Sequence, residues 1–375
     1  MSSNLDNVSP SRSVLQIDLG AVRRNYRRLL QELAGVPSAA VIKADGYGLG
    51  AERVLPALYK EGCRIFFVAT LEEGVRLRPS APTDAQICIL NGVLPGTESA
   101  FREFDLTPVL NSLDQIALWR GFGEKLGQPL PAQLHVDTGM NRLGLGPDEW
   151  ARVESAPELL DGIAWQYLMS HLCSADLPSD PMNRQQLNQF SSAFKTVSGR
   201  MKACFANSSG IFLGPDYHFD LARPGVALFG GRPSAEAPNP LECPIRIEGR
   251  VLQLRTVAVG EPVGYASSWK AQRESRIATL SVGYADGYIR SLSGQGMVMV
   301  GETPCPVVGR VSMDLITVDV TDVEPEQIFP GQTVEVLGPA IRPDDMADRA
   351  GTIGYELLTS LGRRYDRAYI DSEEA

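Results

Sequence analysis

Hydrophobic and polar positions alternate regularly along the first two thirds of the chain. Short apolar runs rich in β-branched residues recur, each followed by a turn and a segment with helical spacing, such as Ala51–Glu61, Ser112–Leu126 and Arg184–Arg200. Strands that alternate with helices pair in parallel, so the pattern predicts eight βα units and favours a closed (β/α)8 barrel of the TIM type. An open sheet of seven or eight strands has the same periodicity and remains the alternative. The eight runs are Ala39–Lys43, Arg64–Ala69, Gln86–Leu90, Leu106–Leu110, Ala132–Asp137, Ile163–His171, Ala203–Asn207 and Phe219–Arg223.

The pattern changes at Pro233–Pro244, a stretch rich in Pro, Ser, Ala and Asn that is typical of a domain linker. Alternating strands punctuated by Gly, Pro and Asp follow it, and a long helical pattern returns only at Met346–Leu361. We therefore expect a disordered N-terminus over 1–11, a barrel over 12–240 and a mostly antiparallel β domain over 241–375. The predicted strands of the second domain are Ile245–Val257, Arg276–Val282, Met297–Val300, Pro306–Val311, Leu315–Val320 and Thr333–Leu337.

Composition limits the classes of function. The net charge of −10 argues against a nucleic-acid partner, which would require a basic face. The start of the chain has neither the basic nor the apolar region of a signal peptide, and no apolar run reaches membrane-spanning length. The six cysteines are scattered without a CxxC pair, so we expect reduced thiols, a cytoplasmic location and no metal site.

Polar residues stand at the predicted carboxyl ends of the barrel strands, where the active sites of such barrels lie. One lysine, one histidine, two arginines and a serine would converge on this rim, which indicates a site for an anion and a carbonyl compound. The strand ends are Lys43, Asp137-Thr-Gly-Met-Asn-Arg142, Ser170-His171, Asn207-Ser208 and Arg223-Pro-Gly225.

Lys43 follows the fully apolar stretch Ala39-Ala-Val-Ile42. Partial desolvation there lowers the pKa of an amine and frees it as a nucleophile. The alternative is a rim lysine with its ammonium group in water. Glycines in the following Asp-Gly-Tyr-Gly-Leu-Gly allow the backbone to approach a ligand, which favours the functional interpretation.

These residues belong to a set of blocks that resembles the alanine racemases. Val41-Ile-Lys43-Ala-Asp-Gly-Tyr47-Gly-Leu-Gly resembles the lysine motif by which this family binds pyridoxal 5'-phosphate (PLP). The resemblance runs from about Leu15 to Arg367. The further blocks, in order, are Asp137-Thr-Gly-Met-Asn-Arg142-Leu-Gly, Ala206-Asn207-Ser208, Arg223-Pro-Gly-Val226-Ala-Leu-Phe-Gly, Val263-Gly-Tyr265, Gly283-Tyr284-Ala-Asp-Gly-Tyr and Gly309-Arg310-Val-Ser-Met313-Asp.

The resemblance implies interconversion of L- and D-alanine by two bases on opposite faces of the substrate. Lys43 would bind PLP covalently and serve one face, and Tyr265 of a second subunit would serve the other. His171 would assist Tyr265 and relay to Arg223, which would face the pyridine nitrogen. The resemblance also implies a homodimer with shared active sites, and an early strand near Val14–Leu19 that joins the second domain.

The same resemblance implies how the ligands are held. PLP phosphate would be bound by Tyr47, by the Ser208 hydroxyl, and by backbone near Asn207, Gly225 and Val226. The substrate carboxylate would meet Arg142 and the backbone of Met313, while Tyr284 would narrow the entrance. Taken without the resemblance, His171 is also compatible with core packing, Arg223 with a rim salt bridge, and Tyr265, Tyr284 and Met313 with ordinary strand or packing roles.

Three positions depart from the family pattern. Leu49 stands where many members have histidine. His135 stands where many members carry a carbamate-modified lysine that orients the arginine matching Arg142, so another group must do so here. A phosphate-contacting tyrosine of some members aligns with Arg363, although Tyr365 is near.

Two alternatives remain at this point. The first is a racemase of broader specificity, or a decarboxylase or aldolase that uses PLP on the same scaffold. An arginine at position 223 argues against the decarboxylase, for which we expect an acidic partner at the ring nitrogen. The second is a non-catalytic PLP-binding protein, which would resemble the barrel alone. The residues fit D-alanine synthesis for peptidoglycan and alanine catabolism equally well.

Overall fold

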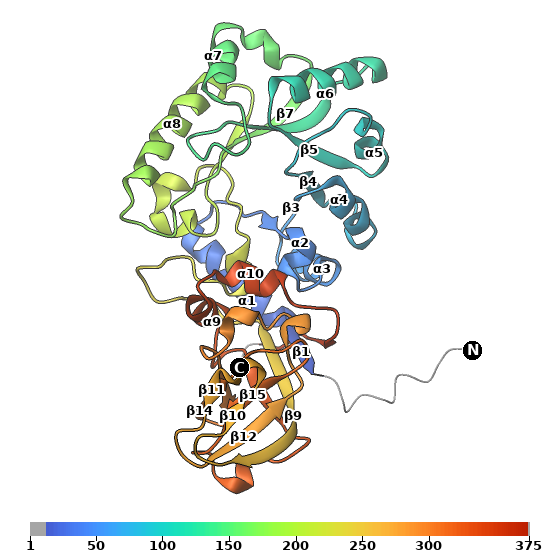
Figure 1. Cartoon of the computed structure of the whole chain (residues 1–375). Helices are drawn as coiled ribbons and strands as arrows, with labels where there is room; N and C mark the ends of the chain where they lie inside the picture. Colours follow the sequence, from blue (N-terminus) through green and yellow to red (C-terminus); the bar gives the residue numbers. More distant parts are fainter. Residues whose placement is uncertain (1–12, 374–375) are drawn as a thin grey trace, which may run out of the picture. The chain divides into compact units, whose positions relative to one another are not determined.

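A computed structural model describes residues 13–373 of the chain (Figure 1). The chain divides into two compact units, residues 22–241 and residues 1–21 together with 242–375. We call them the barrel unit and the β unit. The predicted disordered N-terminus, 1–11, lies outside the described residues.

The barrel unit contains a parallel sheet whose strands follow the order of the chain, from β2 to β8. Short bridges close this sheet, since Leu221 pairs with Cys204 and Ala222 pairs with Ser38. The amide of Ala39 donates to Ala222 O at 2.9 Å. The predicted closed barrel is therefore confirmed, and its eighth strand is reduced to these bridges. The strands are β2 Ala40–Val41, β3 Ile65–Val68, β4 Gln86–Ile89, β5 Leu106–Leu110, β6 Leu130–His135, β7 Ile163–Met169 and β8 Lys202–Cys204.

Inward-facing side chains of β2, β3, β4, β5, β7 and β8 form the hydrophobic core of the barrel, including Val41, Phe67, Val109 and Met169. Helices lie outside the strands (Figure 1) and begin at residues suited to cap them. Thr70 and Glu73 form a capping box at α4, Ser112 caps α6, and Asp180 caps α8. The helices are α1 Leu19–Leu33, α2 Lys43–Tyr47, α3 Ala51–Lys60, α4 Leu71–Leu77, α5 Glu98–Glu103, α6 Leu113–Leu126, α7 Pro147–Ser155 and α8 Pro181–Val197.

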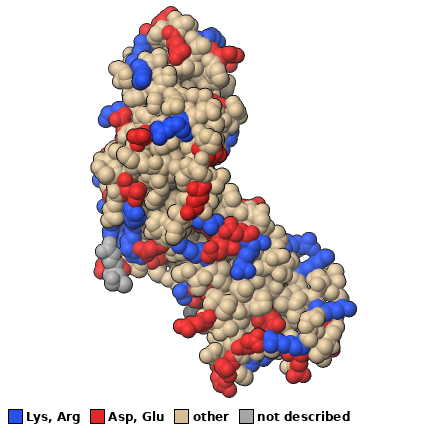
Figure 2. All heavy atoms as spheres, turned by 90° about the vertical axis from the view of Figure 1, so that its left-hand side faces the viewer, with Lys and Arg blue, Asp and Glu red and all other residues tan. Residues whose placement is uncertain are grey.

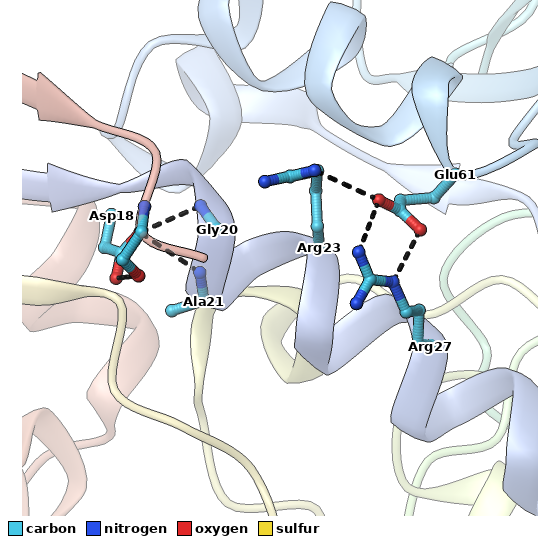
Figure 3. Close-up of polar contacts among 7 residues, drawn as sticks. Asp18, Gly20, Ala21, Arg23, Arg27 and Glu61 are labelled. Atoms are coloured by element: carbon cyan, nitrogen blue, oxygen red, sulfur yellow. Dashed lines mark hydrogen bonds and ion pairs between the residues drawn. The ribbon is translucent and has the colours of Figure 1, made fainter. Parts of the chain in front are cut away.

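An ion-pair cluster joins the first helix of the barrel unit to the end of α3 (Figure 3). Arg27 Nε donates to Glu61 Oε2 at 2.7 Å, and Arg23 Nη1 lies 3.4 Å from Glu61 Oε1. The Glu61 side chain is only 13% exposed, and its hydrogen bond from Arg27 lowers the pKa of the carboxyl. These contacts hold two outer helices together.

The β unit has one mixed sheet in the order β12-β15-β14-β13-β16-β9-β1-β17, and β12 also pairs with β9. The second pairing closes six strands into a small antiparallel barrel. The long strand β9 also pairs with β1, which in turn pairs in parallel with β17. The strands are β1 Val14–Asp18, β9 Ile245–Val257, β12 Ser275–Leu280, β13 Met297–Val300, β14 Thr303–Val308, β15 Ile316–Asp319, β16 Thr333–Leu337 and β17 Asp366–Ile370.

The predicted β domain is confirmed, with two local differences. The helical pattern of Met346–Leu361 forms two helices, α9 Pro343–Ala350 and α10 Gly354–Thr359, because Gly351 has a positive φ of 71° and ends the first. A small hairpin of β10 Pro262–Val263 and β11 Trp269–Lys270 was not predicted.

None of the helices in 13–373 is long and apolar enough to span a membrane. The face drawn in Figure 2 mixes acidic and basic side chains without a continuous basic area.

Candidate active site

Lys43 lies at the carboxyl end of the first barrel strand and begins an unusual turn. Ala44, Asp45 and Gly46 all have left-handed backbone angles, with φ of 53°, 55° and 64°. This conformation costs about 1–2 kcal/mol for each residue other than glycine. Glu73 holds the turn, since its Oε1 accepts from the Ala44 amide at 2.7 Å and its Oε2 accepts from the Ala69 amide at 2.7 Å. The lysine is thus fixed by both the strand and α4.

The environment of Lys43 lowers the pKa of its amine, as the sequence predicts. Burial is the largest cause, and the positive charges of Arg142 and Arg223 act in the same direction. The carboxylate of Glu73 opposes them. A lowered pKa increases the fraction of neutral amine, which is the nucleophilic form. The same effect shows that both arginines lie near Lys43.

Arg223 is a buried cation, 3% exposed. Its Nη2 donates to Ser170 O at 2.7 Å, and its Nη1 donates to Cys204 O at 3.1 Å. No carboxylate among the described residues pairs with it, so the alternative of a rim salt bridge is not realised. Nε makes no hydrogen bond within the described chain. A buried charge without a counter-ion is costly and is typical of a site that receives a polar ligand.

His171 lies beside Arg223, with Nδ1 3.5 Å from Arg223 Nη2. Guanidinium nitrogens only donate, so His171 Nδ1 is the acceptor. Burial lowers the pKa of His171 well below its usual value, and the charge of Arg223 contributes in the same direction. The ring is therefore neutral and carries its proton on Nε2. This leaves one N–H of His171 for a further partner.

A group of backbone amides surrounds the Ser208 hydroxyl. Ser208 Oγ accepts from the amides of Gly225 at 2.9 Å and Ala227 at 3.2 Å, so its own proton is available to a ligand. A Cβ on Gly225 would lie 2.2 Å from the Tyr47 hydroxyl, which shows how closely Tyr47 approaches this backbone. The short 3₁₀ helix Val226–Phe229 begins at the same place.

Asn207 differs from its neighbours because both ends of its amide are used within the barrel unit. Nδ2 donates to Leu172 O at 3.2 Å, and Oδ1 accepts from the Gly210 amide at 2.8 Å. Its side chain therefore fixes the loop that carries Ser208. Any contribution of Asn207 to ligand binding comes through its backbone or through this positioning.

Arg142 is exposed and makes no hydrogen bond or ion pair with residues 13–373. Its charge nevertheless contributes to the lowered pKa of Lys43 and of His171. The barrel rim thus brings together the lysine, the histidine, both arginines and the serine predicted from the sequence. Sequence analysis missed Glu73, although its capping motif with Thr70 is recognisable, and Asn111, which directly follows the strand β5.

The remaining predicted residues lie on adjoining loops of the β unit. A Cβ on Gly264 would lie 3.3 Å from the Arg310 amide, and the Ala285 amide donates to Met313 O at 3.0 Å. These contacts place the loops of Tyr265, Met313 and Tyr284 side by side. The three side chains are 70%, 53% and 43% exposed, respectively. They do not serve as packing residues within the β unit.

Of the two residues considered near the end of the β unit, Arg363 is exposed and Tyr365 is buried. Burial raises the pKa of Tyr365, and the neighbouring carboxylate of Asp286 acts in the same direction. Tyr365 therefore belongs to the interior of the β unit. Arg363 is the one whose charge is open to solvent.

Two family models match the chain: the alanine racemase N-terminal domain over residues 17–233 and the alanine racemase C-terminal domain over residues 245–369. The chain belongs to the alanine racemase family. An alanine racemase of Methylobacterium sp. (strain 4-46) is 47% identical over 97% of this chain and 99% of its own length. A catabolic alanine racemase of Agrobacterium fabrum is 46% identical over 95% of this chain and 92% of its own.

Solved structures show the same relationship. A crystal structure of alanine racemase from Bartonella henselae with covalently bound pyridoxal phosphate has a TM-score of 0.90 and 41% identity. It covers 96% of this chain and 100% of that one. The biosynthetic alanine racemase of Pseudomonas aeruginosa has a TM-score of 0.85 and 34% identity, with 96% and 99% coverage. A relative named as catabolic and one named as biosynthetic are therefore both similar to this chain.

Proposed function

We propose that the chain is a PLP-dependent alanine racemase and that Lys43 and Tyr265 are its two bases. Membership of the family and coverage of both domains support the reaction. One observation carries the assignment of the site. Lys43, whose pKa is lowered, and the buried Arg223, which has no carboxylate partner among the described residues, lie on the same barrel rim. A non-catalytic binder would not need the β unit, which the second family model also matches.

The residues present fit PLP. The guanidinium of Arg223 lacks a carboxylate and has a free Nε, which suits an unprotonated ring nitrogen because arginine only donates. The Ser208 hydroxyl and the closely approached backbone of Gly225 and Val226 suit a phosphate, with Tyr47 beside them. When bound, PLP supplies an electron sink that acidifies the Cα–H of the substrate.

Each base of this chain would act on one face of the substrate. The Lys43 amine removes or returns a proton at Cα on the face where it is held by β2 and the left-handed turn. The Tyr265 oxygen does so on the other face. The Nε2–H of His171 can donate to this oxygen and stabilise it after proton loss. Burial, with the charge of Arg223, lowers the pKa of His171 and keeps its ring neutral. Each positioned acid or base contributes typically about 10²–10⁴ in rate.

Arg142 and Met313 would hold the alanine carboxylate, the first through its guanidinium and the second through its backbone. Tyr284 would narrow the entrance and favour a substrate as small as alanine. The strong exposure of Tyr265, Met313 and Tyr284 supports a homodimer, in which the β unit of one subunit faces the barrel unit of the other.

The experiment measures PLP binding and turnover together. The purified protein is loaded with PLP, its visible absorption spectrum is taken, and D-alanine formation from L-alanine is followed beside Lys43→Ala. We expect a lysine-bound band and racemisation in the wild type and neither in the variant. A band without alanine turnover would contradict the substrate assignment and favour another PLP enzyme on the same scaffold or a non-catalytic PLP-binding protein. Racemisation of L-serine beside that of alanine would favour the racemase of broader specificity. Absence of the band after loading would contradict the cofactor assignment.

A further inference from the structure

His135 lies at the end of β6 and is buried, 8% exposed. Its Nδ1 is 2.7 Å from Asn111 Oδ1. The direction of the Asn111 amide is fixed, because Nδ2 donates to Leu90 O at 3.0 Å and to Val109 O at 2.9 Å. The reversed amide would place Oδ1 against two carbonyl oxygens. Asn111 Oδ1 is therefore an acceptor, and His135 Nδ1 carries the proton that it accepts.

The second ring nitrogen of His135 consequently bears a lone pair, provided that the ring is neutral. Burial, with a contribution from the positive charges of Arg223 and Arg142, lowers the pKa of His135 to about 3, although the carboxylate of Asp137 acts in the opposite direction. The ring is thus neutral at any pH at which the enzyme would work. No residue within 13–373 donates a hydrogen bond to Nε2.

The loop that carries Arg142 passes beside this side of the ring. The Leu145 amide donates to His135 O at 2.8 Å, which ties the loop to the end of β6. A Cβ on Gly144 would lie 3.0 Å from His135 Cδ2, the carbon bonded to Nε2. Arg142 stands two residues before Gly144 and has no partner of its own among the described residues. Within residues 13–373, His135 Nε2 is therefore an acceptor without a donor and the Arg142 guanidinium is a donor without an acceptor, and the two lie on adjoining segments.

We propose that His135 Nε2 accepts a hydrogen bond from the guanidinium of Arg142 and orients it toward the substrate carboxylate. Asn111 takes part by fixing the tautomer. His135 is a positioning residue, since it acts through Arg142. The role in substrate binding rests on the proposed function, whereas the tautomer and the contact with Arg142 do not.

The first test reads the histidine nitrogens directly by ¹⁵N NMR. The chain has three histidines, so His171 and His218 variants assign the His135 signals. Spectra are recorded for the apo protein and for the PLP-loaded protein saturated with propionate, which is alanine without its amino group. We expect a protonated Nδ1 and an unprotonated Nε2 in both, with the Nε2 signal moved by Arg142→Ala. A protonated Nε2, or a signal unmoved by Arg142→Ala in both states, would overturn the proposal.

The second test separates positioning from stability. His135→Phe removes the acceptor, whereas His135→Gln keeps an amide oxygen at a similar reach. We expect His135→Phe to raise KM for alanine and Kd for propionate about tenfold, as loss of a hydrogen bond to a charged group implies, with a smaller change in kcat. His135→Gln should restore part of both. His218→Phe is the control, because His218 is also buried but bonds to Ile211 O, and it should leave both constants unchanged.

A double variant decides whether His135 acts through Arg142. If it does, His135→Phe adds little to the loss already caused by Arg142→Ala, because contacting residues are not additive. Independent, multiplying losses would overturn the proposal, as would equal effects of His135→Phe and His135→Gln. A protein that binds no PLP would contradict the proposed function, yet the apo NMR comparison would still decide the contact.

Discussion

The barrel rim and the exposed loops of the β unit carry the two halves of the proposed site, and they are built differently. On the rim, Arg223 and Ser208 are 3% and 4% exposed and are tied to several strand ends by hydrogen bonds. On the β unit, Tyr265 and Met313 are 70% and 53% exposed. Arg223 and Ser208 are thus held in place before any ligand arrives, whereas Tyr265 and Met313 are exposed on their loops.

This difference indicates a division of tasks. Chemistry that depends on charge and on a lowered pKa requires burial, which the barrel provides within one chain. In the proposed mechanism, the second base would reach the opposite face of the substrate from another subunit, and Tyr265 is exposed as this role requires.

Tyr265→Phe removes only the hydroxyl from an exposed side chain. Its effect should fall on one proton transfer, so we expect racemisation to be about 10²–10⁴ slower. Exchange of the Cα hydrogen with solvent should be lost from one enantiomer and kept for the other. The unfolding midpoint should stay the same. Solvent-hydrogen exchange at Cα measured separately from each enantiomer checks this. An equal loss of exchange from both enantiomers, or full racemase activity, would contradict the role of Tyr265 as a base.

Arg223→Ala should disturb both function and stability, in contrast to Tyr265→Phe. The carbonyls of Ser170 and Cys204 would lose their donors inside the barrel, at about 2–4 kcal/mol in total. Urea unfolding of the barrel unit measures the change. Arg102→Ala serves as the matched control, since Arg102 is exposed and its side chain makes no hydrogen bond or ion pair in the described chain. It should change stability by less than about 0.5 kcal/mol. Equal stability of the two variants would contradict the buried role of Arg223.

Gly225→Ala tests the backbone on the rim that we propose binds the PLP phosphate. The new Cβ would lie 2.2 Å from the Tyr47 hydroxyl, so Tyr47 or the backbone must move, at about 1–3 kcal/mol. We expect weaker PLP binding, measured by equilibrium titration. Gly121→Ala is the control, because a Cβ there meets nothing within 4 Å. Unchanged PLP affinity in Gly225→Ala would show that this backbone does not hold the phosphate.

Glu61→Gln lies on the outside of the barrel unit and should alter stability without altering the rim (Figure 3). The folded state lowers the pKa of Glu61 from 4.5, so its ionised form stabilises the fold above that pH. We expect a loss of about 1 kcal/mol near neutral pH, because Arg27 is partly exposed. The difference from wild type should shrink as pH falls through the lowered pKa. A difference independent of pH would exclude the ion pair as its cause.

Much of the fold is readable in the sequence because local patterns decide it. The predicted apolar runs coincide with the barrel strands, and Ser112 begins the predicted segment Ser112–Leu126 and caps α6. The eighth strand shrinks to bridges at Leu221 and Ala222, which depends on closure of the ring rather than on any local signal. The hairpin of β10 and β11 has two residues on each side, too few for a periodic pattern.

The site residues also divide into those that local patterns predict and those that depend on contacts between distant segments. The rim residues are predictable because parallel strands place their carboxyl ends together. The protonation pattern of the two histidines is not, since it depends on contacts between distant segments. His171 accepts from Arg223, 52 positions away, whereas His135 donates to Asn111, 24 positions away. His171 carries its proton on Nε2 and His135 carries its proton on Nδ1. These tautomers could be assigned only from the positions of the hydrogen-bond partners.

The most direct test of the contrast between the two halves mixes two defective chains. Lys43→Ala and Tyr265→Phe chains carrying different tags are coexpressed, and the mixed dimer is purified through both tags. If the barrel unit of one subunit works with the β unit of the other, one of the two sites contains both Lys43 and Tyr265. The account predicts that the mixed dimer regains about half of the wild-type racemase activity per dimer. Activity no greater than the average of the two defective homodimers would contradict it, because each site would then be built within one chain.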